Sequence, residues 1–172
     1  MPIDTSKALG YALGEGEYTY TRDDVILYHL GVGAGVPATD SNELEYTYEK
    51  DLKVLPSFGV IPTFGSMGGL GNVPGLEFNF AMLLHGEQDI VLHQPIPPEA
   101  TITNSGKVAE IWDKGKAALV VMQVDTKDDA GQPLFKVLGT ARSGDMPIYN
   151  THAGWLNYPV ERLISEANEQ IE

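Results

Sequence analysis

The 172-residue chain contains no cysteine. This absence excludes disulfide bonds, thiolate nucleophiles and thiolate metal ligands. No apolar run approaches the ~18 residues that a membrane-spanning helix needs. Residues 1–10 also lack the basic stretch and following apolar stretch of a secretory signal. From these absences we expect a cytoplasmic protein that has no membrane partner.

Basic residues are scarce, with 11 Lys and Arg against 24 Asp and Glu and a formal net charge of −13. An acidic surface repels nucleic acid, so we expect no nucleic-acid partner. The chain has 4 histidines, and none lies at a close metal-ligand spacing such as H-x-x-x-H. The sequence therefore predicts no metal site.

The residues that are present suffice for one domain, since 42% are apolar and the length allows a sizeable core. Residues 1–20 predict a lead-in with a short extended piece. Residues 21–35 predict a helix in which Thr21 caps the start and Asp23 and Asp24 match the positive end of the helix dipole. Glycines between Gly31 and Gly35 would end this helix.

The following segment is less regular. Residues 44–49 alternate well enough for a strand, although a loop or a short helix is equally open. Residues 56–64 predict one short buried helix, with Pro56 near its first turn and Pro62 kinking or ending it. The glycine-rich residues 67–75 predict a flexible loop.

The second half predicts strands at residues 89–96 and 95–115, and then two strands around the turn at residues 128–132. Residues 158–172 predict an amphipathic helix, with Val160, Leu163, Ile164 and Ala167 on one side. This order of elements is typical of an α+β protein in which helical segments cover one face of a curled sheet.

Four segments then carry a resemblance to a known family: "RDDVILYHLGVGAG", "YTYEKDLKVLPSFGVIPTF", "LLHGEQDIVLHQPIPPEATI" and "AEIWDKGKAALVVMQV". Together they resemble the N-terminal, non-catalytic half of the MaoC-like (R)-specific 2-enoyl-CoA hydratases, as found in multifunctional enzymes of type 2. The resemblance implies a single hotdog fold, a curled antiparallel sheet wrapped on a short central helix. It implies a hotdog domain at residues 1–142, followed by a tail at residues 143–172 that holds the amphipathic C-terminal helix.

Catalytic halves of this family carry the motif Y-R-L-S-G-D-x-N-P-L-H. Laid without gaps over "LYHLGVGAGVPA" (27–38), the catalytic Asp falls on Gly33, the Asn on Gly35 and the His on Ala38. The resemblance therefore implies that this chain has no catalytic residues of its own. In residues 143–152, "SGDMPIYNTH", Asp145 and His152 only partly match the motif, and we interpret this piece as a loop after a strand.

The resemblance also places a substrate site at the start of the central helix, where a thioester is expected to bind. We expect the acyl pocket to be lined or supported by Tyr28, Leu55, Phe58, Gly59, Val60, Ile61, Phe64 and His85. Lys114 and Lys116 are candidates for holding the phosphates of coenzyme A, or else hairpin lysines that keep a sheet edge soluble. The CoA thioester would be the substrate, and no further cofactor is expected.

The histidines have simpler interpretations. His29 is expected to be structural or exposed, and His93 to face solvent. His85, close to Glu87, is expected to orient a neighbour by hydrogen bonding at the start of a strand.

Three functions stay open. The first is a non-catalytic acyl-pocket subunit of a 2-enoyl-CoA hydratase, acting on fatty-acid or steroid side chains with a catalytic MaoC-like partner. In this case Gly31, Gly33 and Gly35 would leave room for a bulky acyl group. The second is a homodimer that binds acyl-CoA without catalysis. The third is a stand-alone hydratase or thioesterase that uses displaced residues, His85 with Glu87 or Asp145. Association is expected in each case, because a lone hotdog sheet leaves an edge strand uncovered.

Overall fold

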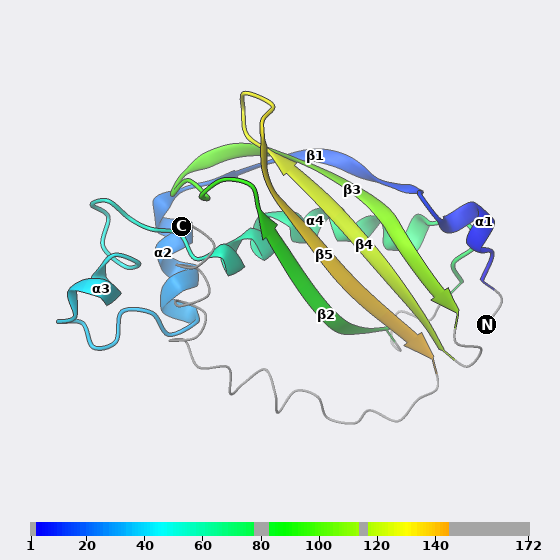
Figure 1. The fold of residues 1–172 in the computed structure, drawn as a ribbon, viewed down its shortest axis with the longest axis horizontal. Helices are drawn as coiled ribbons and strands as arrows, with labels where there is room; N and C mark the ends of the chain where they lie inside the picture. The colour runs from blue at the N-terminus through cyan, green and yellow to red at the C-terminus, as the bar shows by residue number, and fades with distance from the viewer. Residues whose placement is uncertain (1–2, 78–82, 114–116, 145–172) are drawn as a thin grey trace.

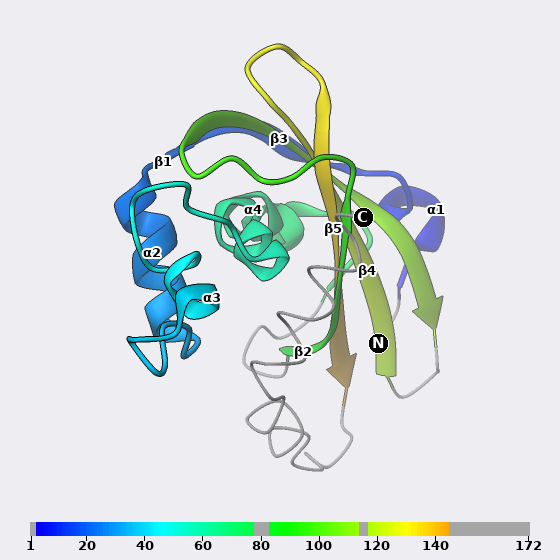
Figure 2. The ribbon, with the colours of Figure 1, turned by 60° about the vertical axis from the view of Figure 1, so that its left-hand side comes forward.

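The computed structural model describes residues 3–77, 83–113 and 117–144. A five-stranded antiparallel sheet curls around one central helix (Figures 1 and 2). Its strands are β1 (Ala12–Tyr20), β2 (Leu83–Leu92), β3 (Ala100–Asp113), β4 (Ala117–Lys127) and β5 (Pro133–Gly144), in the order β1-β3-β4-β5-β2. This arrangement confirms the expected α+β hotdog fold. No helix among the described residues is long and apolar enough to cross a membrane.

The helical elements are α1 (Thr5–Ala8), α2 (Arg22–Gly31), α3 (Ser41–Leu44), the 3-10 helix η1 (Pro56–Gly59), α4 (Val60–Met67) and the 3-10 helix η2 (Gly68–Asn72). Viewed along its axis, α4 lies inside the curl of the sheet (Figure 2). The helices α2 and α3 lie on the side of α4 that faces away from the sheet. Residues 44–49, for which a strand was one alternative, form no strand: Leu44 ends α3, and residues 45–49 follow it as a turn and a bend.

The helix predicted after Thr21 is confirmed as α2. The Thr21 hydroxyl accepts a hydrogen bond from the Asp24 backbone N–H, and the Asp24 carboxylate accepts from the Thr21 backbone N–H, which forms a capping box. These hydrogen bonds from Thr21 hold the pKa of the Asp24 carboxyl below its usual value.

The expectation that Pro62 kinks or ends the central helix is wrong. The helix begins at Val60 and continues to Met67, so Pro62 lies in the first turn, where its missing N–H is not needed. Its carbonyl accepts a hydrogen bond from Asn104 Nδ2 at 2.8 Å. The Asn104 side-chain oxygen Oδ1 in turn accepts from the Thr126 hydroxyl at 2.7 Å, so buried polar groups join α4 to β3 and β4.

Residues 67–75, predicted as a flexible loop, largely form η2. Leu70 and Val73 of this segment are buried against the inner face of the sheet. The apolar residues in a glycine-rich stretch thus cover one end of the core. Within this segment, Gly69 packs tightly against β1. A Cβ at this position would be 2.4 Å from the Leu13 carbonyl oxygen, which leaves no room for a side chain.

The core occupies the space between α4 and the inner face of the sheet. One cluster gathers around Phe58, Phe135 and Tyr20 at the start of α4. A second cluster gathers around Leu70 and Val120 at the other end. The aromatic and β-branched residues of alternating strand positions therefore hold the central helix along its length.

Candidate functional site

The segment that aligns with the catalytic motif lies at the end of α2. Gly33 and Gly35 have positive φ angles of 96° and 85°, and the Gly35 N–H donates to Glu43 Oε2 at 2.8 Å. A Cβ at Gly35 would lie 2.9 Å from Thr47 Cγ2. Both glycines therefore serve the backbone conformation, and neither position carries a group that transfers protons.

Glu43 is a residue that sequence reasoning missed. Its carboxylate lies beside the position of the motif's Asn, but it accepts the backbone N–H of Gly35 and so holds the glycine turn in place. Ala38, at the position of the motif's His, is exposed. Only the register of α3 against the turn, which the sequence pattern does not reveal, brings Glu43 to this place.

His29 is fully buried, which agrees with the structural and not with the exposed interpretation. Its Nε2 accepts the Leu55 backbone N–H at 3.1 Å, so Nδ1 carries the proton and donates to the Tyr46 carbonyl, 2.6 Å away. The imidazole therefore joins α2 to the segment that leads into the central helix. Burial lowers its pKa, and the hydrogen bond to Tyr46 partly opposes this shift.

The lowered pKa of His29 predicts a pH-dependent stability. Above the ordinary histidine pKa of 6.5, the ring is neutral in both states and its contribution is fully present. Below it, the unfolded state binds a proton that the folded state resists, so the free energy of unfolding falls. Denaturant titrations at about pH 7.5 and about pH 5.5 should show a smaller decrease in a His29→Gln variant. An equal decrease in both proteins would contradict the assignment.

Two of the predicted pocket residues support the site from within the core. Leu55 is 0% exposed and Phe58 is 1% exposed. The Phe58 ring packs edge-on against the rings of Tyr20 and Tyr28, with centroids 5.0 and 5.6 Å apart. Gly59 is buried too, and a Cβ there would lie 3.2 Å from the Phe135 ring. This close packing sets the position at which α4 starts.

Other predicted residues lie nearer the surface. Tyr28 and Val60 are half-buried. Burial raises the pKa of the Tyr28 phenol. Ile61 is 43% exposed and Phe64 is 73% exposed. These two residues lie one turn apart on α4, next to the exposed Gly65, and we call Ile61, Phe64 and Gly65 the α4 flank.

His85 pairs with a different residue from the one suspected. A β-bulge at Gly86 sets His85 opposite Ala141 and Glu87 opposite Thr140, so the two side chains leave on opposite faces of β2. His85 Nε2 lies 2.8 Å from Gln88 Oε1. Gln88 Nε2 in turn donates to the Leu138 carbonyl at 3.1 Å. The expected orienting hydrogen bond is present, but the structure does not bring His85 and Glu87 together.

Some sequence predictions lie outside the described residues. Lys114 and Lys116, the suggested phosphate contacts, belong to this group, as do Asp145, His152 and the helix expected at residues 158–172. His93 is exposed, as expected. Within residues 3–77, 83–113 and 117–144, no three His, Asp or Glu side chains lie close enough together to hold a metal ion.

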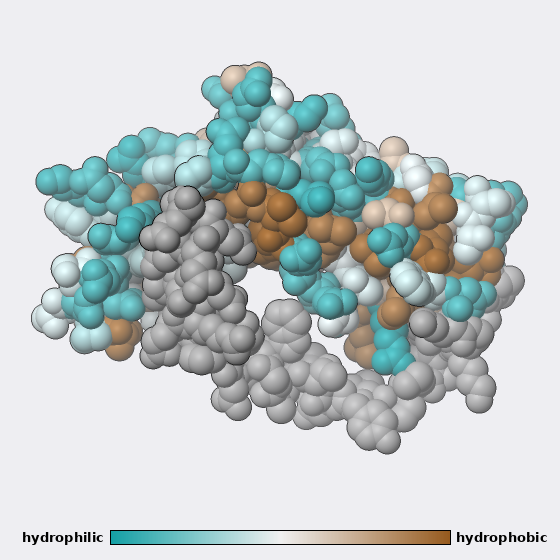
Figure 3. Space-filling view, viewed as in Figure 1, coloured by the Kyte–Doolittle hydropathy of each residue, from teal (hydrophilic) through white to brown (hydrophobic). Residues whose placement is uncertain are grey.

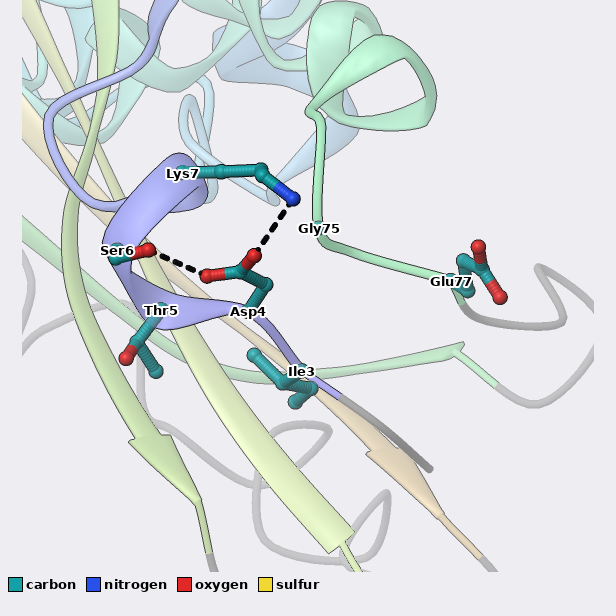
Figure 4. Close-up of a pocket in the computed structure, with 7 residues that line it drawn as sticks. All are labelled: Ile3, Asp4, Thr5, Ser6, Lys7, Gly75 and Glu77. Atoms are coloured by element: carbon teal, nitrogen blue, oxygen red, sulfur yellow. Dashed lines mark hydrogen bonds and ion pairs between the residues drawn. The ribbon is translucent and has the colours of Figure 1, made fainter.

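A shallow pocket of about 460 Å³ lies between α1 and the segment after η2, at the other end of the molecule from α2 (Figures 1 and 4). The Asp4 carboxylate lies 2.8 Å from Lys7 Nζ and accepts from the Ser6 hydroxyl at 2.6 Å. The hydrogen bond from Lys7, together with that from Ser6, lowers the pKa of Asp4 to about 2. Asp4 and Lys7 are thus paired with each other, and the Glu77 carboxylate also lines the pocket. This polar, acidic lining makes the pocket a weak candidate for an acyl or thioester site.

A curled antiparallel sheet around a central helix defines a hotdog protein. The crystal structure of a MaoC-like dehydratase from Phytophthora capsici shares this fold, with a TM-score of 0.70 and 27% identity over 86% of this chain and 52% of that one. Residues 18–141 match the family described as MFE-2 hydratase 2 N-terminal domain. The chain belongs to this family.

Curated relatives agree with this assignment. The chain is 36% identical to peroxisomal enoyl-CoA hydratase 2 of Arabidopsis thaliana, over 73% of this chain and 42% of the relative. It is 43% identical to peroxisomal multifunctional enzyme type 2 of Mus musculus, over 68% of this chain and 16% of the relative. The match thus spans less than half the length of either protein.

Proposed function

We propose that this chain is a non-catalytic acyl-pocket half of a 2-enoyl-CoA hydratase, which acts with a MaoC-type catalytic partner. The observation that carries the proposal is the motif segment. Gly33 and Ala38 stand at the positions of the motif's catalytic Asp and His, Gly35 stands at the position of its Asn, and the nearby Glu43 carboxylate accepts the Gly35 backbone N–H. The relatives named as enoyl-CoA hydratases support the reaction class.

Hydration of a trans-2-enoyl thioester to a 3-hydroxyacyl thioester needs a base that takes a proton from water and an acid that delivers one to the α-carbon. In this proposal the partner supplies both groups. This chain supplies apolar surface for the acyl tail, at about 25 cal/mol per Å² buried. Among the predicted pocket residues, Tyr28 and Val60 are half-buried and Ile61, Phe64 and His85 are exposed, so these five are open to a ligand.

The place for the partner is the edge of the sheet at β2. This strand pairs with β5 on one side, and its other side has no strand partner among the described residues. A row of unpaired backbone groups is a template for pairing with another strand. His85 and Gln88 lie on the inner face of this edge, and the Gln88 amide and Met67, the last residue of α4, both lie against Gly139. In this proposal the second hotdog also covers the α4 flank, whose Ile61 and Phe64 are exposed.

The substrate, in this proposal, is an acyl-CoA with a fatty or steroid side-chain acyl group, and no other cofactor takes part. A cytoplasmic location is part of this proposal. Two of the relatives are named as peroxisomal, so a peroxisomal location is the alternative. The nucleotide would meet an acidic chain of net charge −13, so its phosphates need basic residues from this chain or from the partner.

Phe64→Asp tests where the partner binds. The substitution places a charge on the most exposed aromatic residue of the α4 flank, so we expect association to weaken about tenfold or more, as when an aromatic anchor is removed from a protein–protein interface. Sedimentation velocity would measure association with the catalytic hotdog half of a MaoC-like hydratase, and also self-association. Thermal unfolding of the variant should be almost unchanged, because Phe64 is 73% exposed.

Tyr48→Asp is a matched control, since Tyr48 is also exposed, at 54%, but lies in the segment after α3. Equal association of Phe64→Asp and the unmodified chain would remove the α4 flank from the interface. The alternative function, a homodimer that binds acyl-CoA, makes a different prediction. It requires a stable self-associated species that retains palmitoyl-CoA and does not exchange with the catalytic half.

A further inference from the structure

The sheet has an outer face, turned away from α4, that is partly apolar. In β4, Ala118, Val120 and Met122 are buried inside, so Leu119 and Val121 point outward and are half-buried. Figure 3 views this face and shows hydrophobic residues gathered over the strands, where an open antiparallel sheet normally carries polar ones. In many proteins an apolar sheet face of this kind is covered by another segment of the chain or by a partner.

Leu138 and Val91 lie on this face toward one end, and a larger group of apolar residues lies at the other. Strand register places Trp112 opposite Leu119, Leu119 opposite Arg142, and Arg142 opposite Leu84, so one row crosses four strands. Trp112 is 53% exposed and Leu84 is 38% exposed. With Val121 in the next row, we call Leu84, Trp112, Leu119 and Val121 the end patch.

The chain leaves the sheet at this patch. β5 ends at Gly144, which pairs with Ala117 of β4, only two residues beyond the row that contains Arg142. Residues 145–172, which number 172 − 144 = 28, follow from that point. Whatever these residues cover, they start beside the end patch.

At the same end of the sheet, the inner face is already covered by α1 and η2. Ala141 and Val120, which point inward, are buried together with Ala8, Leu70 and Val73 of α1, η2 and the residue after η2. A segment that leaves β5 here therefore finds apolar sheet surface on the outer side.

We propose that residues 158–172 dock on the end patch. Their sequence pattern predicts a helix with Val160, Leu163, Ile164 and Ala167 on one side. Such a helix is about 22 Å long, enough to cross the roughly 15 Å between β3 and β2. Residues 145–157 span up to about 43 Å when extended, so the segment reaches the patch without strain.

Docking would bury the apolar side of the segment against the patch and leave its carboxylates in water. It would cover an apolar area that otherwise favours non-specific association. The β2 edge, on which the proposed function depends, would stay accessible, so the two proposals stand or fall separately.

The chain has no cysteine, so a single introduced thiol reports on one place. We expect Leu119→Cys to react with iodoacetamide about tenfold faster when the same chain carries Leu163→Asp and Ile164→Asp, because these charges release the segment. Val121→Cys, in the next row, should respond in the same way and replaces Leu119→Cys if that variant does not fold. Ser165→Asp, on the opposite side of the helical pattern, should leave both rates unchanged.

Phe64→Cys distinguishes the two sides of the sheet. If the thiol at position 64 is the one whose rate rises with Leu163→Asp and Ile164→Asp, the segment covers the α4 flank and the proposal fails. Rates at positions 119 and 121 that do not change would also overturn it.

Discussion

Replacement of His29 by alanine is expected to lower the free energy of unfolding by about 3–5 kcal/mol. The imidazole is 0% exposed and bonds the Tyr46 carbonyl through Nδ1 and the Leu55 N–H through Nε2. Alanine would leave both buried backbone groups without a partner and would open a cavity between the rings of Tyr28 and Tyr46. Urea denaturation followed by circular dichroism would measure the decrease.

The control for this change is His93→Ala. His93 is exposed, so its removal should alter stability by no more than about 0.5 kcal/mol. If the two variants were destabilised by similar amounts, His29 would not hold α2 to the entry of the central helix. The result would bear on the site itself, since Tyr28 precedes His29 and Leu55 precedes η1.

Gly69→Ala is expected to be almost as damaging, at about 3 kcal/mol, because it overpacks the contact between η2 and β1. A Cβ at this position would lie 2.4 Å from the Leu13 carbonyl oxygen and 3.2 Å from the Leu13 carbonyl carbon and Cα. These are backbone atoms of the residue at a register shift in β1, and the residues on either side of it, Ala12 and Gly14, are paired with β3, which limits how far Leu13 can move. The melting temperature should fall by more than about 5 °C.

The adjacent Gly68→Ala is the matched control. A Cβ at Gly68 would meet nothing within 4 Å, and alanine also limits the unfolded chain, so stability should stay equal or rise slightly. A Gly69→Ala variant that melts together with Gly68→Ala would show that η2 does not pack on β1 as described.

Local signals predicted the parts of the fold that depend on neighbouring residues. The Thr21 and Asp24 side chains form the capping box that starts α2, and alternation in residues 117–142 marks β4 and β5. Pro62 misled the prediction, because its effect depends on where the helix starts. A preceding 3-10 turn places it in the first turn of α4. Propensity alone does not reveal that starting point.

The site was only partly predictable for a similar reason. The positions of Gly33, Gly35 and Ala38 follow from alignment with a motif, but the hydrogen bond from Gly35 to Glu43 requires α3 to fold back on the turn. The pairing of His85 with Gln88 depends on a β-bulge at Gly86 that shifts the alternation by one residue. Without that shift, His85 and Glu87 share a face, as the sequence suggested.

The central claim is that this chain does not carry the acid and base of the hydratase. The most direct test is the rate at which the purified chain hydrates crotonyl-CoA, alone and with the catalytic hotdog half of a MaoC-like hydratase. We predict no increase over the uncatalysed rate for the chain alone, and an increase for the mixture beyond that of the catalytic half by itself. Turnover by the isolated chain that rises with its concentration and disappears in His85→Ala would contradict the account.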